Sequence, residues 1–167
     1  MRARLFLLLG VSLLTGCTPI VRLQSNARPE IRPDFHRILI VSRLPNSRQT
    51  YLPGFLSAFP AQYQVCTVEI SPISFDTPEE AIRRQVDQCK SEVMLTIDVN
   101  RNFTEGGGKY ISSYTDLYLE LTNIATGQPF WKALITAGTS EINPRAIVQQ
   151  LQKDGMIELS APPAYSR

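Results

Sequence analysis

The sequence has few of the residues from which most catalytic and metal sites are built. It contains one histidine, His36, and three cysteines, and no two cysteines have the C-x-x-C spacing typical of a zinc site. A catalytic imidazole also needs a nucleophile or an acid beside it, with a third group to orient the ring. We therefore expect His36 to be structural or exposed, and we expect no metal and no other cofactor.

A long apolar run and an excess of positive charge are missing as well. The apolar segment 5–14 has about half of the roughly 20 residues that a membrane-spanning helix needs. Beyond residue 16 the chain carries fifteen basic and fifteen acidic residues, because Arg2 and Arg4 lie before that point. Nucleic-acid-binding domains show a basic excess or a basic stripe. We therefore expect no nucleic-acid partner, and a length of 151 residues predicts one domain.

The first seventeen residues have the pattern of an export signal. Two arginines precede the short apolar segment, and small residues follow it. The end of the segment, Leu14-Thr15-Gly16-Cys17, resembles the bacterial lipobox. This resemblance implies that residues 1–16 are a signal peptide, that the chain is cut before Cys17, and that palmitate-type acyl chains are attached to this cysteine. Two or more acyl chains make a stable membrane anchor. The alternative is an ordinary secretory signal that happens to contain a cysteine.

The residue after the cysteine indicates in which membrane the protein is anchored. In the lipoprotein family an aspartate at the next position favours retention in the inner membrane. This chain has Thr18 there, so the resemblance implies the outer membrane, with the domain facing the periplasm. The segment 17–35 contains three prolines and almost no periodic pattern, which predicts an extended linker.

Hydrophobic periodicity predicts a single mixed α/β (α+β) domain over residues 36–158 and a flexible tail over 159–167. The expected order is β-α-β-α-β-β-β-α in one five-stranded sheet. Strands joined by helices should be parallel, and those joined by hairpins should form an antiparallel meander. The clearest helix start is Thr77-Pro78-Glu79-Glu80, which has the pattern of a capping box. The expected strands are 37–42, 64–71, 92–101, 110–122 and 129–139, and the expected helices are 48–59, 78–89 and 143–155.

Side-chain alternation predicts the register of the last hairpin. A loop over 124–128 keeps all apolar residues on one face, whereas a slip of one residue would mix the faces. On the polar face we expect Asp98 to lie opposite Tyr114. The pairs expected in the last hairpin are Leu121 with Trp131, Leu119 with Ala133, Leu117 with Ile135 and Glu120 with Lys132.

This order of elements resembles a group of small envelope domains. The shared features are a third strand that enters a long meander, the turn Thr126-Gly127 before Phe130-Trp131-Lys132-Ala133, and a last helix that ends in Leu151-Gln152-Lys153-Asp154-Gly155. The group includes the N-terminal domain of the Tol-Pal translocation protein, the curli-secretion lipoprotein and lipoprotein activators of peptidoglycan synthases. The resemblance covers residues 36–158 and concerns architecture, which does not by itself indicate function.

Two features are candidates for a partner surface. Three tyrosines recur every four residues on the outward face of one strand, and aromatic residues with a polar tip are enriched at interfaces. The hairpin before them is rich in glycine, which suits either a simple turn or a contact loop. Both features also have a purely structural explanation, since tyrosine favours strands and glycine favours turns. The residues are Tyr110, Tyr114 and Tyr118, with Gly106, Gly107 and Gly108.

The remaining candidate residues are two cysteines and three carboxylates. Cys66 begins a strand and Cys89 ends the following helix, so a helix that crosses back over its strand brings them together. A disulfide there would stabilise the fold by roughly 3 kcal/mol, and two buried thiols are the alternative. The carboxylates Asp98, Asp116 and Glu120 lie on a solvated sheet face, and glycan hydrolysis would require a cleft that holds two of them.

We expect a lipid-anchored envelope protein that is not an enzyme. It would bind an envelope protein, or a copy of itself, in envelope or surface-polymer assembly. One alternative is a subunit of an oligomeric ring or export apparatus, which the curli-like resemblance implies. A second alternative is a glycan-acting enzyme.

Overall fold

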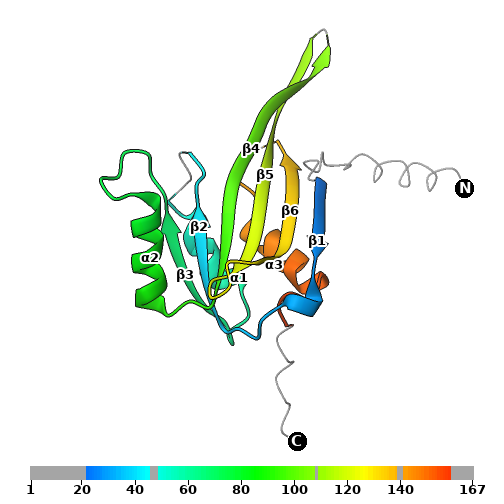
Figure 1. The fold of residues 1–167 in the computed structure, drawn as a ribbon. Coiled ribbons are helices and arrows are strands. Elements are labelled where there is room, and N and C mark those ends of the chain that lie inside the picture. Colours follow the sequence, from blue (N-terminus) through cyan, green and yellow to red (C-terminus); the bar gives the residue numbers. More distant parts are fainter. Residues whose placement is uncertain (1–21, 46–48, 108, 139–140, 159–167) are drawn as a thin grey trace, which may run out of the picture.

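The protein folds into one six-stranded mixed sheet with helices on both faces (Figure 1). The computed structural model describes residues 22–45, 49–107, 109–138 and 141–158. The strand order across the sheet is β1-β6-β5-β4-β2-β3. The elements are β1 (Arg22–Ala27), a 3-10 turn (Pro29–Ile31), β2 (Arg37–Ser42), α1 (Tyr51–Ala58), β3 (Gln64–Glu69), α2 (Pro78–Cys89), β4 (Val93–Gly107), β5 (Tyr110–Asn123), β6 (Pro129–Ala137) and α3 (Pro144–Lys153).

The mixed α/β class and the arrangement of the two halves are confirmed. β2 pairs in parallel with both β3 and β4, and β4, β5 and β6 form an antiparallel meander. The expected register of the last hairpin is confirmed at all four pairs, including Leu121 with Trp131 and Glu120 with Lys132. The apolar residues of these strands therefore share one face, as the alternation predicted.

The number of strands is the first correction, because β1 adds a sixth. It lies within the segment that was expected to be an extended linker, and it pairs antiparallel with β6 from Arg22–Thr136 to Ala27–Trp131. Only Leu23 and Ala27 are packed against the core, so a strand at this edge shows little hydrophobic alternation in its sequence. Backbone pairing holds it instead, and the Gln150 side chain adds a hydrogen bond of 3.0 Å to Ser25.

The long hairpin is the second correction. Asp98 lies opposite Tyr118, whereas Tyr114 lies opposite Phe103. The expected pairing of Asp98 with Tyr114 is wrong because both strands continue well past Arg101, and because a bulge between Val99 and Arg101 shifts the register. Beyond the rest of the sheet, residues 102–107 and 110–115 form a two-stranded projection, which we call the arm (Figure 1).

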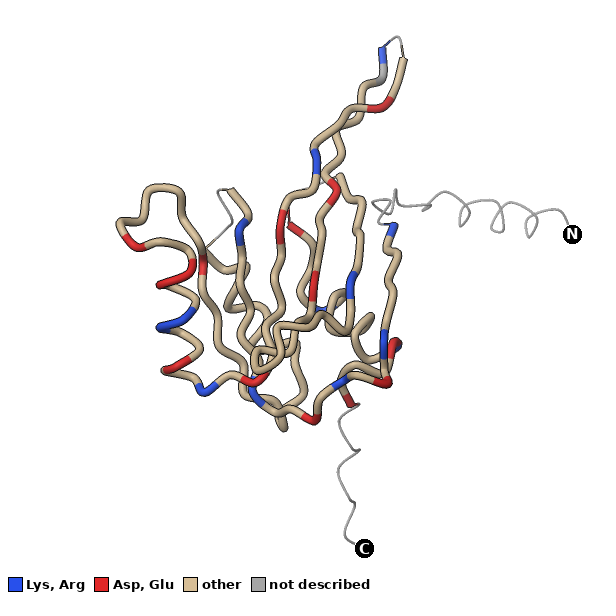
Figure 2. The backbone as a smooth tube through the Cα atoms, in the orientation of Figure 1, with Lys and Arg blue, Asp and Glu red and all other residues tan. Residues whose placement is uncertain are grey.

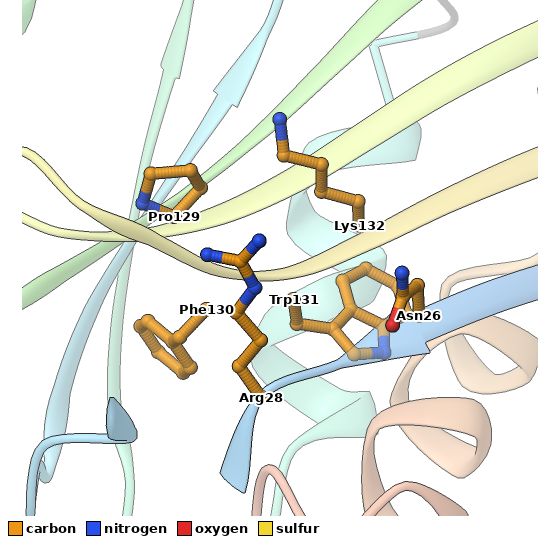
Figure 3. Close-up of a pocket in the computed structure, with 6 residues that line it drawn as sticks. All are labelled: Asn26, Arg28, Pro129, Phe130, Trp131 and Lys132. Carbon is orange, nitrogen blue, oxygen red and sulfur yellow. The ribbon is translucent and has the colours of Figure 1, made fainter. Parts of the chain in front are cut away.

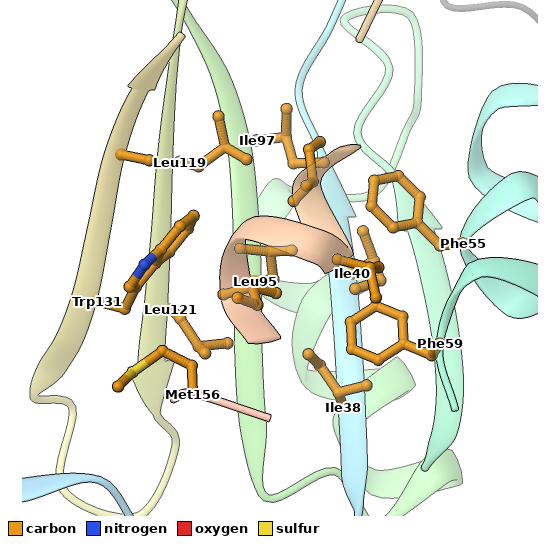
Figure 4. Packing of buried hydrophobic residues seen from close by; sticks show 14 of the residues in the cluster. Ile38, Ile40, Phe55, Phe59, Leu95, Ile97, Leu119, Leu121, Trp131 and Met156 are labelled. Carbon is orange, nitrogen blue, oxygen red and sulfur yellow. The ribbon is translucent and has the colours of Figure 1, made fainter. Parts of the chain in front are cut away.

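The core lies between the sheet and the helices α1 and α3 (Figure 4). Pro53 and Gly54 are poor residues for a helix interior, yet α1 forms because it buries Tyr51, Leu52 and Phe55. Gly54 also has a packing role, since a Cβ atom there would lie 3.0 Å from Cγ of Pro144 at the start of α3. The two helices therefore approach closely over the apolar face of the sheet.

Helix α2 covers the opposite face, over β2 and β3. Its capping box is confirmed, because Thr77 and Glu80 exchange side-chain to backbone hydrogen bonds. No residue of α2 is fully buried, so packing alone holds this helix weakly. Cys89 at its end is joined to Cys66 of β3 by a disulfide bond.

Candidate functional site

The outward face of β4, β5, β6 and β1 is covered by no helix within the described part of the chain. Helices α1 and α3 lie on the other face, and α2 lies over β2 and β3. We call this uncovered surface the open sheet face. It carries the outward side chains of the meander, among them Tyr118, Glu120 and Lys132, and it is bordered by β1. Figure 2 shows acidic and basic residues interspersed over these strands, so no large area has one sign of charge.

A hydrogen-bonded group occupies the centre of the open sheet face. Lys132 Nζ lies 2.9 Å from Glu120 Oε2, and the hydroxyl of Tyr118 donates to the same oxygen at 2.7 Å. Thr122 donates to the other carboxylate oxygen at 3.2 Å. The Lys132 ammonium also lies 5.8 Å from the centre of the Tyr118 ring. These contacts fix the orientation of the Tyr118 ring, which stays half-exposed on the face.

A second group lies where the arm leaves the sheet. Asp116 is buried, and its carboxylate accepts hydrogen bonds of 2.5 Å from both Arg101 and Thr136. The Arg101 guanidinium in turn lies 4.8 Å from the centre of the Phe103 ring. Phe103 and Tyr114 stack across the hairpin with their centroids 5.6 Å apart. The base of the arm therefore carries two aromatic rings held in place by a buried carboxylate.

Two hollows lie on the open sheet face. One of about 150 Å³ sits at the base of the arm, where Arg22 and Glu105 face Tyr114. The other, about 320 Å³, is a wide depression beside β1 that Gln24, Asn26 and Tyr118 line. Both bring the edge strand β1 next to the aromatic side chains of β5. The depression beside β1 is wide and open, so it suits the protruding side chains of a partner better than an enclosed small molecule.

A third hollow, about 130 Å³, lies at the other end of β1 (Figure 3). Arg28 and Lys132 line it together with Trp131, which is itself almost fully buried. The Trp131 indole donates a hydrogen bond of 2.7 Å to Asp154 of the segment after α3. This hollow therefore lies at the surface of the β1–β6 pair, above the buried side chain of Trp131.

Two carboxylates of this face, those of Asp116 and Glu120, have a pKa below the ordinary value. Hydrogen bonds from Thr136 and then Arg101 keep the pKa of Asp116 below its ordinary value. Partial burial alone would raise the pKa of Glu120, but hydrogen bonds from Tyr118 and Lys132 outweigh it and lower the pKa. A glycosidase needs one carboxyl group with a raised pKa to act as general acid. Neither Asp116 nor Glu120 has a raised pKa.

Replacing Asp116 with asparagine should lower the free energy of unfolding at pH 7 by about 1.5 kcal/mol, because a charge-assisted hydrogen-bond pair is lost. The folded-state pKa is below the ordinary value of 3.8, so the carboxylate stabilises the fold above that pH. This stabilisation disappears as the pH falls through the folded-state pKa. Urea unfolding of both proteins at pH 7 and near pH 3 measures the effect.

The matched control for this prediction is Asp98→Asn. Asp98 lies on the same face and pairs with Arg43 at 3.3 Å, but both side chains are more than one-third exposed. Exposed ion pairs contribute little, so this variant should change the unfolding free energy by less than about 1 kcal/mol. An Asp116→Asn effect equal to that of the control, or one that does not decrease between pH 7 and pH 3, would contradict the role of the buried carboxylate.

The structure places the other candidate residues as follows. Tyr114 and Tyr118 are half-buried on the open sheet face, while Gly106 and Gly107 lie in the arm. Cys17, Gly108 and the side chain of Tyr110 lie outside the described residues. His36 is exposed and stacks on Tyr63 with 6.2 Å between ring centroids. No cluster of potential metal ligands, and no helix long and apolar enough to cross a membrane, occurs in the described ranges.

The sequence pattern missed two contributions to the open sheet face. Arg101 was regarded as the last residue of a strand, although it orders Phe103 and binds Asp116. The side chains of Gln24 and Asn26 were assigned to the linker, although β1 brings them beside Tyr118. The alternation of β5 could have indicated Asp116 as the partner of a nearby arginine, but no signal in the sequence places β1.

Comparison by sequence gives no match, either to a protein-family model or to a curated protein. Comparison of structures finds distant likenesses. The chain is similar to the PelC dodecamer from Paraburkholderia phytofirmans, with 12% identity over 84% of this chain and 100% of that chain and a TM-score of 0.47. It is also similar to lipoprotein GNA1162 from Neisseria meningitidis, with 16% identity over 70% of this chain and 92% of that chain and a TM-score of 0.37. No statement about the function of this chain follows from these likenesses.

Proposed function

We propose that this protein is a lipid-anchored, non-catalytic protein of the cell envelope that binds a partner protein through its open sheet face. The observation that carries the proposal is the group of half-exposed aromatic rings on a face that no described helix covers. Tyr118 is fixed by Glu120 and Lys132, and Tyr114 is stacked on Phe103. Rigid aromatic side chains lose little conformational entropy on binding and dominate the energy of many interfaces.

The anchor is proposed at Cys17, with the domain on the periplasmic side of the outer membrane. Leu14-Thr15-Gly16-Cys17 is the sequence feature that supports lipidation, and Thr18 supports the outer membrane. The disulfide between Cys66 and Cys89 agrees with an exported protein, because such bonds persist in oxidising compartments.

The absence of catalysis is part of the proposal and rests on the state of the carboxylates. Asp116 is buried and bound to Arg101, and Glu120 is bound to Lys132. Both have lowered pKa values and both already accept hydrogen bonds from neighbouring side chains. We interpret these residues as supports that orient the aromatic rings, with a role in envelope or surface-polymer assembly through protein binding.

One observation favours the alternative of an oligomeric ring or export apparatus. β1 lies at the edge of the sheet, and within the described residues it pairs only with β6. A free strand edge is a template for pairing with another chain. If copies of this protein join through that edge, the mass of the purified lipoprotein in detergent will be a multiple of the monomer mass.

The proposed partner surface is tested by cross-linking in intact cells, followed by purification of the protein. Replacing both Tyr114 and Tyr118 with alanine should reduce the yield of the cross-linked partner about tenfold or more, since truncating one interface hot spot costs about 2 kcal/mol. Leu56→Ala is the matched control, because Leu56 is 55% exposed on helix α1 on the opposite side of the sheet. The control should retain the partner.

Three results would decide between the alternatives. A partner lost in the double tyrosine variant and retained in the control supports the open sheet face. Equal capture by all three proteins shows that the tyrosines are ordinary sheet residues. Cross-linked multimers of the protein alone favour the oligomeric ring.

A further inference from the structure

The distance between the lipidated cysteine and the folded domain is short. The sheet begins at Arg22, five residues after Cys17. A fully extended chain spans at most about 3.5 Å per residue, so Cys17 lies within about 18 Å of Arg22 whatever path the chain takes. The end of the sheet where β1 begins must therefore stay close to the surface of the membrane that holds the acyl chains.

The strand directions define which parts of the domain share that end. β1 runs antiparallel to β6, whereas β2, β3, β4 and β6 run the other way. The end at which β1 begins is therefore the end at which those four strands finish. Arg22 pairs with Thr136, Thr136 with Asp116, and Asp116 with Arg101, so these residues form one row across the sheet.

From this row the arm extends past the end of the sheet at which β1 begins (Figure 1). β4 continues for six residues from Arg101 to Gly107, which corresponds to about 20 Å at the rise of a strand. This length is about equal to the greatest possible distance between Arg22 and Cys17. A bilayer that faces this end is therefore within reach of the arm, even when the connecting chain is fully extended.

The exposed apolar side chains are concentrated at the same end. Ile111 in the arm is 73% exposed. Ile73 and Phe75, in the segment that joins the end of β3 to α2, have relative exposures of 88% and 108%. The other two large apolar residues that are exposed lie elsewhere: Leu56, on helix α1, has 55% exposure, and Ile31, beyond the opposite end of β1, has 39%. The three most exposed large apolar side chains of the described residues thus project from the end at which β1 begins.

We propose that this end of the domain is a membrane-contact surface, at which Ile111, Ile73 and Phe75 enter the interfacial region of the bilayer that holds the lipid anchor. This inference rests on the proposed lipidation of Cys17. The three side chains stand on two separate projections, Ile73 and Phe75 on the segment between β3 and α2 and Ile111 on the arm. Such isolated apolar tips suit a deformable lipid surface, whereas a protein partner generally needs a continuous apolar patch.

Neighbouring residues have the chemistry of a membrane interface. Arg43 follows β2 at this end, Arg101 lies at the base of the arm, and Arg22 begins β1. Arginine side chains bind lipid phosphates. A surface of this kind sets the strands upright on the bilayer. The open sheet face then stands roughly perpendicular to the membrane, where a periplasmic partner can approach it from the side.

The test uses the full lipidated chain in vesicles of phosphatidylethanolamine and phosphatidylglycerol whose acyl chains are brominated, because bromine quenches nearby tryptophan. The three variants are Ile111→Trp, Phe75→Trp and the control Leu56→Trp, each at an exposed position where a larger side chain fits. The natural tryptophan, Trp131, is 1% exposed and provides a constant background. The first two variants should lose at least twice as large a fraction of their added fluorescence as the control.

The results distinguish this inference from the proposed anchor. Quenching that is equal in all three variants, or greatest in Leu56→Trp, overturns the membrane-contact surface while leaving the lipid anchor in place. Flotation of the vesicles tests the anchor separately. Wild type should float with the vesicles and Cys17→Ser should not. Equal flotation of the two proteins would overturn lipidation at Cys17 and, with it, the inference that rests on it.

Discussion

Replacing Trp131 with alanine should lower the free energy of unfolding by about 3–5 kcal/mol, the range found for removing a large aromatic side chain from a core. Trp131 is 1% exposed and lies opposite Leu121 in the β5–β6 hairpin, beneath the segment that follows α3 (Figure 4). The same substitution leaves the carboxylate of Asp154 without its indole donor. Urea unfolding followed by circular dichroism measures the loss without relying on tryptophan fluorescence.

Trp131→Phe separates packing from hydrogen bonding. Phenylalanine fills most of the volume but cannot donate to Asp154, so a smaller loss of about 1–2 kcal/mol is expected. Burial tends to raise the pKa of Asp154, but the hydrogen bond from Trp131 and others outweigh burial and lower it. The effect of Trp131→Phe should therefore shrink at acid pH. A loss below about 1 kcal/mol for Trp131→Ala would contradict the position of this side chain in the core.

The part of the fold that the sequence predicts well is the part with a strong hydrophobic pattern, either a continuous apolar run or a long alternation. The continuous apolar run of β2 is typical of a strand buried on both faces, and Leu39 and Ile40 are both fully buried. In the last hairpin, one register alone keeps Leu121 and Trp131 on the same face, and that register is observed. Where burial is one-sided and long, the hydrophobic effect determines both the element and its pairing.

The sequence does not indicate β1, because this strand is stabilised by backbone pairing and not by a buried hydrophobic face. Its sequence is mostly polar, and its residues are largely exposed, since an edge strand needs only backbone partners on one side. Arg28 continues this attachment with a hydrogen bond of 2.8 Å from its backbone nitrogen to the carbonyl oxygen of Phe130. Interactions of the backbone leave no residue pattern, so a segment of this kind resembles a linker until the neighbouring strand is known.

The candidate site was predicted only in part for a similar reason. Tyr114 and Tyr118 lie on the outward face, as expected, because alternation determines the face of each residue in β5. Their neighbours depend on the bulge between Val99 and Arg101, which places Arg101 opposite Asp116 and Phe103 opposite Tyr114. A single inserted residue changes every later pair in a hairpin. Without that information, the sequence indicated an ordinary polar face and not a set of ordered rings.

Removing the disulfide should lower the free energy of unfolding by an amount similar to that expected for Trp131→Ala. The double variant Cys66→Ser/Cys89→Ser should have a free energy of unfolding about 3 kcal/mol lower than that of wild type. The reason is that the bond closes a loop across 23 positions and restricts the unfolded chain. The loss should appear first in helix α2, which buries no residue fully and has its capping box at the opposite end. Hydrogen exchange of the α2 amides, with urea unfolding for the whole domain, measures both parts.

Reduction provides the matched control for that variant. A reducing agent should lower the stability of wild type to that of the double serine variant, and it should leave the variant itself unchanged. If the two cysteines were separate thiols, the reducing agent would have no effect on either protein. Because α2 shields only β2 and β3, the variant should keep the binding of the open sheet face as long as the domain stays folded. Loss of that binding along with α2 would instead place the partner surface across both parts of the sheet.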